Sequence, residues 1–135
     1  MKQVLLEIAL EAAHRAGAVL RERVGGEQEI ERKGYRDVVT EADRAAEAAV
    51  LSAIEARFPD HAILSEEAGA ISGDSPYTWV VDPLDGTTNF SRGHPTFSVS
   101  VGVLHQGTPV VGVVYDPLRE QTFAKASENL ELTLE

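Results

Sequence analysis

The sequence predicts an α+β fold in which two amino-terminal helices pack on a mainly antiparallel sheet. Up to Pro59, apolar residues recur mostly every three or four positions, as they do on one face of a helix. Beyond that point, short apolar or alternating segments are separated by glycine, proline and aspartate, as strands are separated by turns. Helices first and strands afterwards indicate a helix layer covering one face of a sheet.

The first helix is predicted from Val4 to Val24. Leu5, Ile8, Ala12, Ala16 and Val19 would form its buried face, and the glycine pair that follows would end it. The polar stretch 27–37 has no apolar period and is predicted as a loop or a short hairpin.

A second helix is predicted to begin at Thr40 and to end just before Pro59. Thr40 and Asp43 match the capping-box spacing, in which two side chains satisfy the free amides of the first helical turn. This pattern by itself gives both residues a structural role, and Asp43 could still present its second carboxylate oxygen elsewhere.

Strands are predicted at 62–64 and 78–81, joined by a polar connection from Gly69 to Pro76. Strict alternation of apolar and small residues from Phe97 to Val103 predicts a further strand with one buried face. Short turns then lead to strands at 110–115 and 121–126, so these last three strands should form an antiparallel meander.

Length and charge limit the function classes. The chain has 135 residues, of which 43% are hydrophobic, which suits a single domain over 1–135 with an acidic tail at 127–135. A net charge of −10 argues against a nucleic-acid partner, because phosphate backbones are bound by basic surfaces. No apolar run is long enough to span a membrane and no signal peptide is recognisable, so we expect a soluble, cytoplasmic protein. The chain contains no cysteine, so any metal must be bound by oxygen or histidine.

The segment Trp79–Asn89 is the strongest indication of function. Asp82 and Asp85 follow a buried strand, and their carboxylates are the hard oxygen ligands that Mg²⁺ prefers. The carbonyl oxygen of Leu84 could complete the ligand set. Gly86, Thr87 and Thr88 could then offer backbone amides to a phosphate if a helix begins there.

The same residues also have plainer interpretations. Two aspartates three positions apart, with proline and glycine beside them, are typical of an ordinary turn after a core strand. Glu66 and Glu67 follow the strand at 62–64, and adjacent carboxylates indicate either a solvated loop or a nearby cation.

The whole string Trp79–Phe90, WVVDPLDGTTNF, resembles the first signature of the inositol monophosphatase family. The segment Asp37–Asp43 resembles the family's D-x-V-T-x-x-D segment, and Ser65-Glu66-Glu67 matches its S-E-E or G-E-E motif. The resemblance implies that Glu66, Asp82, Asp85 and the Leu84 carbonyl bind metal, that Asp43 hydrogen bonds to a catalytic Thr87, and that Glu66 also serves catalysis. It further makes Lys33 a candidate for approaching the phosphate.

The family resemblance implies a layered α/β sugar-phosphatase fold, of which this chain would be the first half. The implied activity is Mg²⁺-dependent hydrolysis of a phosphomonoester, most simply myo-inositol monophosphate, by a homodimer. Fructose 1,6-bisphosphate and a nucleotide 3'-phosphate are alternative substrates. The family's second signature, W-D-x-A, is absent, since Trp79 is the only tryptophan and Val80 follows it. A catalytically inert half that only binds metal is therefore the third alternative.

Overall fold

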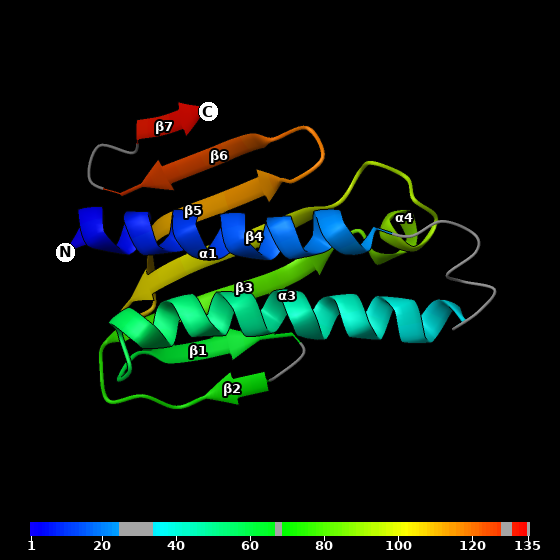
Figure 1. Ribbon diagram of the computed structural model, residues 1–135. Coiled ribbons are helices and arrows are strands. Elements are labelled where there is room, and N and C mark those ends of the chain that lie inside the picture. Colours follow the sequence, from blue (N-terminus) through cyan, green and yellow to red (C-terminus); the bar gives the residue numbers. More distant parts are fainter. Residues whose placement is uncertain (25–33, 67–68, 128–130, 135) are drawn as a thin grey trace.

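Two long helices cover one face of a single sheet (Figure 1). The computed structural model describes residues 1–24, 34–66, 69–127 and 131–134. Within these ranges α1 (Lys2–Arg23) lies beside α3 (Tyr35–Arg57), with α1 over β4 and β5 and α3 over β3. Neither helix has the apolar stretch that a bilayer crossing requires.

The sheet has seven strands in the order β2-β1-β3-β4-β5-β6-β7. Neighbouring strands in the sheet are antiparallel, except for β1 and β3, which run parallel. The predicted α+β class, with a mainly antiparallel sheet under two amino-terminal helices, is confirmed. The strands are β1 (Ala62–Ser65), β2 (Gly69–Ile71), β3 (Tyr77–Asp85), β4 (Ser98–His105), β5 (Thr108–Asp116), β6 (Gln121–Ala126) and β7 (Glu131–Leu134), with a short helix α4 (Thr87–Ser91) after β3.

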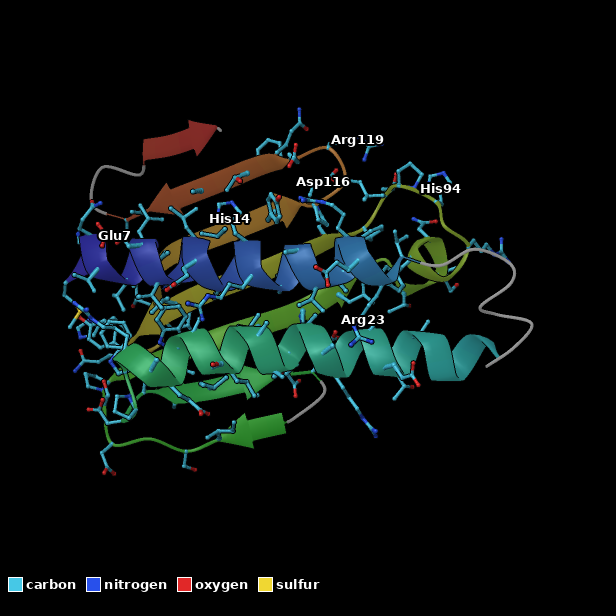
Figure 2. All side chains as sticks on the ribbon, viewed as in Figure 1. Glu7, His14, Arg23, His94, Asp116 and Arg119 are labelled. Atoms are coloured by element: carbon cyan, nitrogen blue, oxygen red, sulfur yellow. The ribbon has the colours of Figure 1, made fainter. Side chains whose placement is uncertain are left out.

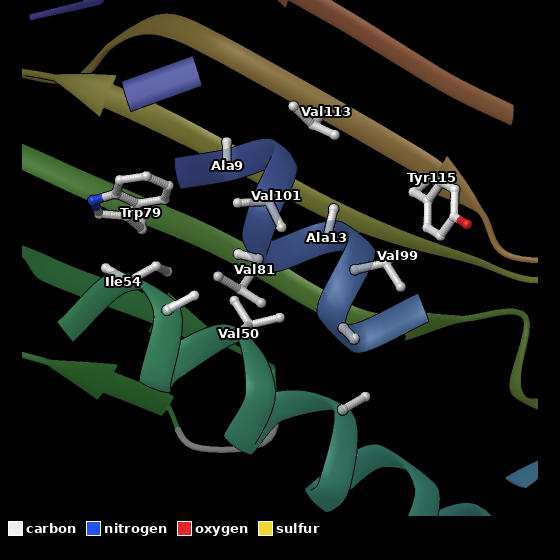
Figure 3. Packing of buried hydrophobic residues seen from close by; sticks show 14 of the residues in the cluster. Ala9, Ala13, Val50, Ile54, Trp79, Val81, Val99, Val101, Val113 and Tyr115 are labelled. Atoms are coloured by element: carbon white, nitrogen blue, oxygen red, sulfur yellow. The ribbon is translucent and has the colours of Figure 1, made fainter. Parts of the chain in front are cut away.

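The core lies between the helix pair and the sheet (Figure 3). Valines on alternate positions of β4 point into it, as the alternation predicted: Val99, Val101 and Val103 are at most 1% exposed. From α1 come mostly alanines, which let the helix approach the strands closely. Trp79 is the largest of the fully buried side chains.

Helix α3 begins earlier than predicted, at Tyr35 instead of Thr40. Gly34, with φ of 86°, precedes its first turn, and no side chain caps it. No glycine or proline stands between Tyr35 and Thr40, so nothing stops the helix from extending back to Gly34. The capping box predicted for Thr40 and Asp43 was therefore wrong, and both residues lie inside the helix. Most of the predicted loop 27–37 lies outside the described residues, but its last three residues are helical.

The sheet is also larger than predicted. The connection at Gly69–Pro76 contains the edge strand β2, and part of the tail forms β7 beside β6. Strand β3 runs on to Asp85, past the predicted end at Val81. Pro83 has no amide hydrogen to donate, and the pairing with β4 shifts register between Asp82 and Asp85, so the strand continues through an irregular segment.

Candidate metal centre

The parallel pairing of β1 and β3 brings two acidic segments to the same edge of the sheet. Ser65 pairs with Val81, so the next residues along each strand, Glu66 and Asp82, become neighbours. They are distant in sequence, and only the parallel register places their carboxylates together. This register gives a structural reason for grouping Glu66 with Asp82, which the sequence had supported only through the family resemblance.

The register shift at the end of β3 sets the orientation of the two aspartates. Leu84 between them is buried, with 3% of its surface exposed, and anchors this segment in the core. Asp85 is exposed, whereas Asp82 is half-buried. The backbone amide of Leu84 donates a hydrogen bond to the Asp82 carboxylate, which holds that side chain in place.

Electrostatic repulsion is concentrated on Asp82. The pKa of Asp82 is raised from 3.8 to about 6, chiefly because the carboxyl group is partly buried and next because the charges of Glu66 and Asp85 lie nearby. A hydrogen bond with Glu66 acts in the same direction, because protonated Asp82 can donate to it, while the amide of Leu84 opposes the shift. A divalent cation between these carboxylates would remove the repulsion, so their chemistry fits Mg²⁺.

The carboxylates of Glu66, Asp82 and Asp85 do not form a complete metal-binding site. Among the described residues, no three Asp, Glu, His or Cys side chains are close enough to hold an ion by themselves. Carboxylates repel one another whenever they are close, whereas an ion is held only when several oxygen atoms point toward one position. The raised pKa of Asp82 and the lack of a complete ion site among the described residues are therefore compatible. An ion bound between Glu66, Asp82 and Asp85 would therefore need further oxygen ligands.

Gly86 forms the junction between the acidic segment and α4. Its φ is 94°, and a Cβ atom there would lie 2.9 Å from the Thr96 carbonyl oxygen and 3.2 Å from Phe97. Only glycine fits such a position without strain. A helix does begin after it, at Thr87, and Phe90 anchors this helix by an edge-to-face contact with Phe97, with ring centroids 5.1 Å apart.

Helix α3 approaches the site from the helix-covered side. Asp43 is buried, at 6% exposure, and α3 contacts α4, the helix that begins with Thr87. One turn further along α3, Glu47 accepts a hydrogen bond of 2.7 Å from the Ser65 hydroxyl. This bond ties α3 to the residue that precedes Glu66. Sequence reasoning missed Glu47, although its position four residues after Asp43 puts it on the same helix face.

Hydrogen bonds from Arg119 hold the loop that follows α4. Arg119 lies at the turn between β5 and β6 beside Asp116, as Figure 2 shows, and donates a hydrogen bond of 2.9 Å to the Asp116 carboxylate. The same guanidinium donates to the Pro95 carbonyl at 3.2 Å. The β5–β6 turn is thereby connected to the loop at His94.

The predicted site residues thus have different outcomes in the structure. Glu66, Asp82, Leu84 and Asp85 gather at the ends of β1 and β3, with Gly86, Thr87 and Thr88 directly after them. Lys33 lies outside the described residues. The hydrogen bond from Thr87 to Asp43 and the phosphate contacts of the amides at 86–88 stay predictions.

Comparison with known proteins decides the family. The sequence profile described as the inositol monophosphatase family matches residues 1–132. The chain belongs to the inositol monophosphatase family. It is 51% identical to the inositol-1-monophosphatase of Synechocystis sp. over 98% of its length, and 47% identical to the Nus factor SuhB of Haemophilus influenzae over 88%. The inositol monophosphatase structure from Anabaena superposes with a TM-score of 0.83 at 44% identity over 98% of the chain.

These matches cover only part of each relative. The chain spans 46% of the Synechocystis and Haemophilus proteins and 47% of the Anabaena structure. The relatives therefore carry a further portion of about the same size. The resemblance inferred from WVVDPLDGTTNF is confirmed, as is the expectation that it covers only a portion of the family's length.

Proposed function

We propose that this chain contributes the first metal site of a Mg²⁺-dependent phosphomonoesterase. The observation that carries the proposal is the parallel pairing of β1 and β3, which gathers Glu66, Asp82 and Asp85 where their charges repel one another. Membership of a family named for its phosphatase activity supports the same reaction class. Magnesium, when bound there, would neutralise these carboxylates and acidify a water molecule.

The residues around the acidic segment have distinct roles in this proposal. Glu66, Asp82, Asp85 and the Leu84 carbonyl would hold the cation, and Glu66 would also help to activate the attacking water. Thr87 would orient that water and help to remove its proton, with Asp43 fixing the direction of the Thr87 hydroxyl. The amides of Gly86, Thr87 and Thr88 would hold the phosphate oxygens, and Lys33 is a further candidate for that contact.

We propose myo-inositol monophosphate as the substrate, in a cytoplasmic homodimer. The Synechocystis relative is named an inositol-1-monophosphatase, which favours this choice. Fructose 1,6-bisphosphate and a nucleotide 3'-phosphate remain alternatives within the same chemistry. The name Nus factor, carried by the Haemophilus relative, concerns that protein, and the net charge of −10 favours a small phosphate ester over nucleic acid for this chain.

The deciding experiment measures phosphate release by the chain from myo-inositol 1-phosphate, with Mg²⁺ and with a chelator, beside fructose 1,6-bisphosphate. Release that requires Mg²⁺ would support the proposal, and the faster substrate would identify the specificity. Asp85→Asn should abolish turnover and weaken Mg²⁺ binding without loss of fold, whereas Asp74→Asn, an exposed aspartate in the β2–β3 connection, should change neither. Unchanged Mg²⁺-dependent turnover in Asp85→Asn would refute the site assignment.

A folded chain that binds Mg²⁺ and releases no phosphate would support the inert-half alternative. Calorimetric titration with Mg²⁺ separates that outcome from a chain that binds no metal. Metal binding that is unaffected by Asp85→Asn would refute both versions of the site.

A further inference from the structure

The position of Asp85 depends on the loop that joins α4 to β4, residues 92–97. After the register shift at the end of β3, Asp85 pairs with Ser98, the residue at which this loop enters β4. Gly86 lies against the same loop, since a Cβ atom there would be 2.9 Å from the Thr96 carbonyl oxygen. Movement of the loop would therefore displace Asp85 and the residues that follow it.

Hydrogen bonds to α4 fix the shape of the loop. The side-chain amide of Asn89 donates a hydrogen bond of 2.9 Å to the Thr96 carbonyl, and the backbone amide of His94 donates one of 2.8 Å to the Asn89 carbonyl. Both bonds join the loop to the helix directly before it. They shape the loop but tie it to no other strand of the sheet.

Arg119 ties the loop to a different part of the sheet. This residue lies in the turn between β5 and β6, and its Nη1 atom donates hydrogen bonds of 3.2 Å to the Pro95 carbonyl and 2.9 Å to the Asp116 carboxylate. The Asp116 carboxylate also accepts a bond of 3.0 Å from the Arg119 amide. The bond to Pro95 spans 24 residues of the chain. Figure 2 shows Arg119, Asp116 and the loop residue His94 at the same end of the molecule.

The turn that carries Arg119 is itself anchored to the helix layer. Arg21, in the last turn of α1, donates hydrogen bonds of 3.0 Å to the Pro117 carbonyl and 2.9 Å to the Tyr115 hydroxyl. Arg119 therefore holds the loop from a fixed part of the fold.

The charge of Arg119 acts near the same place. Asp116 and Asp85 both line a hollow of about 290 Å³, and the Asp116 side chain is only 19% exposed. Arg119 neutralises that carboxylate. Without Arg119, the unpaired charge of Asp116 would by itself strengthen the binding of a cation at Asp85, because opposite charges attract. Displacement of Asp85 would weaken that binding, so the two effects have opposite signs.

We propose that Arg119 is a positioning residue for the metal centre. Its hydrogen bond to the Pro95 carbonyl holds the loop, and the loop keeps Asp85 where it can bind a cation. Arg119 touches neither the cation nor the substrate in this role. The inference rests on the proposed function for the role of Asp85 as a ligand, whereas the hold of Arg119 on the loop does not depend on it.

Calorimetric titration of the chain with Mg²⁺ tests the proposal, together with the backbone amide NMR signals of residues 85–87 in the metal-free protein. Arg119→Gln removes the guanidinium, and Arg15→Gln is the matched control. The Arg15 side chain is 52% exposed, compared with 48% for Arg119, and it also pairs with a nearby carboxylate, that of Glu11. Both variants lose one positive charge and leave one acid unpaired, but the pair of Arg15 and Glu11 lies within α1.

Two more variants separate the hydrogen bond from the charge. A single nitrogen of Arg119 makes both side-chain bonds, so the ammonium group of Arg119→Lys can replace it. The double variant Asp116→Asn/Arg119→Gln removes one charge of each sign. Its net charge stays at −10, but the bond to the Pro95 carbonyl is lost.

We expect Arg119→Gln to bind Mg²⁺ about three- to tenfold more weakly, as the loss of one hydrogen bond implies, and to shift the amide signals at 85–87. The double variant should show the same shifts and a loss of affinity at least as large. Arg119→Lys should bind Mg²⁺ like the unaltered chain, and Arg15→Gln should change neither property. The urea midpoint should stay the same in every variant, because exposed ion pairs contribute little stability.

Unchanged or tighter Mg²⁺ binding by Arg119→Gln would overturn the positioning role, and tighter binding would assign the effect to the charge of Asp116. Recovery of Mg²⁺ binding in the double variant would overturn it as well. Amide signals at 85–87 that do not move in Arg119→Gln would overturn the hold on the loop. If the folded unaltered chain binds no Mg²⁺ and these signals do move, the hold on the loop is supported and the proposed metal site is overturned, so the two failures are distinguishable.

Discussion

Replacing Trp79 by phenylalanine tests how the end of α3 is held against the sheet. Trp79 is fully buried, and its indole nitrogen donates a hydrogen bond of 2.9 Å to Nδ1 of His61, which is 6% exposed. The His61 ring stacks on Phe58 at 4.3 Å and on Tyr77 at 5.1 Å. The end of α3, the start of β1 and the start of β3 therefore meet at one imidazole.

The expected loss of stability has two parts. Phenylalanine has no N–H, so the buried Nδ1 of His61 would lose its donor, which costs about 1–3 kcal/mol. The smaller ring also leaves a void, and at about 24 cal/mol per Å³ this adds about 1 kcal/mol. We therefore expect Trp79→Phe to lower the free energy of unfolding by about 2–4 kcal/mol at pH 7.5.

The loss should depend on pH with a definite sign. Burial lowers the pKa of His61 from 6.5, although the Asp60 charge opposes the shift. The unfolded chain then binds the proton more readily, so the stability from neutral His61 is complete above pH 6.5 and decreases as the pH falls toward the folded-state value. The indole N–H occupies the nitrogen that must be protonated. Its removal should therefore make the variant less sensitive to acid than the unaltered protein.

Urea unfolding followed by far-ultraviolet circular dichroism measures both effects, since the variant has no tryptophan for fluorescence. Measurements at pH 7.5 and pH 5.5 give a double difference in which acid effects common to both proteins cancel. A loss below about 0.5 kcal/mol at pH 7.5, which is far less than an orphaned buried acceptor costs, would refute the reasoning. An equal pH dependence in both proteins would refute the role given to Nδ1.

Three further changes test other contacts. Gly17→Ala would drive a methyl group into the Tyr115 ring, so an overpacking cost of about 1–3 kcal/mol should exceed the gain of about 1 kcal/mol in helix propensity and lower the urea midpoint. Ser65→Ala should cost about 1.5–3 kcal/mol in urea unfolding, because it removes the hydrogen bond to the Glu47 carboxylate; an unchanged midpoint would contradict this. The pKa of Asp82 is raised from 3.8 to about 6 in the folded protein, so the folded state binds this proton more tightly than the unfolded chain does. The metal-free protein should therefore lose stability as the pH rises from about 4 to about 6, and Asp82→Asn, measured with a chelator, should not show this loss.

Much of the fold could be predicted because its patterns are local. The alternation from Phe97 to Val103 depends only on the pleat of a strand, and the helical spacing from Leu5 to Val19 only on the helical repeat. Both follow from neighbouring residues, so no knowledge of the tertiary structure was needed. The start of α3 could not be found in this way, because Thr40 and Asp43 fit a capping pattern equally well inside a helix.

The sequence indicated which residues form the candidate site, but not how the fold brings them together. The string from Trp79 to Phe90 indicates candidate ligands on β3 through its family resemblance. No local pattern indicates that β1 lies parallel to β3, and this pairing is what brings Glu66 to Asp82. Glu47 could not be identified either. Its hydrogen bond with Ser65 joins α3 to the end of β1, and only the folded structure shows that these two elements lie close together.

The arrangement separates stability from function within the chain. The largest buried side chains, such as Trp79 from β3 and Phe90 from α4, belong to the hydrophobic core. The candidate ligands lie at the strand ends instead, where Glu66 and Asp85 are exposed. Because the helix-covered core does not need these carboxylates, they can be removed one at a time while the fold persists. Activity and metal binding should therefore respond to Glu66 and Asp85 independently of the unfolding midpoint, whereas changes at Trp79 should affect all three together.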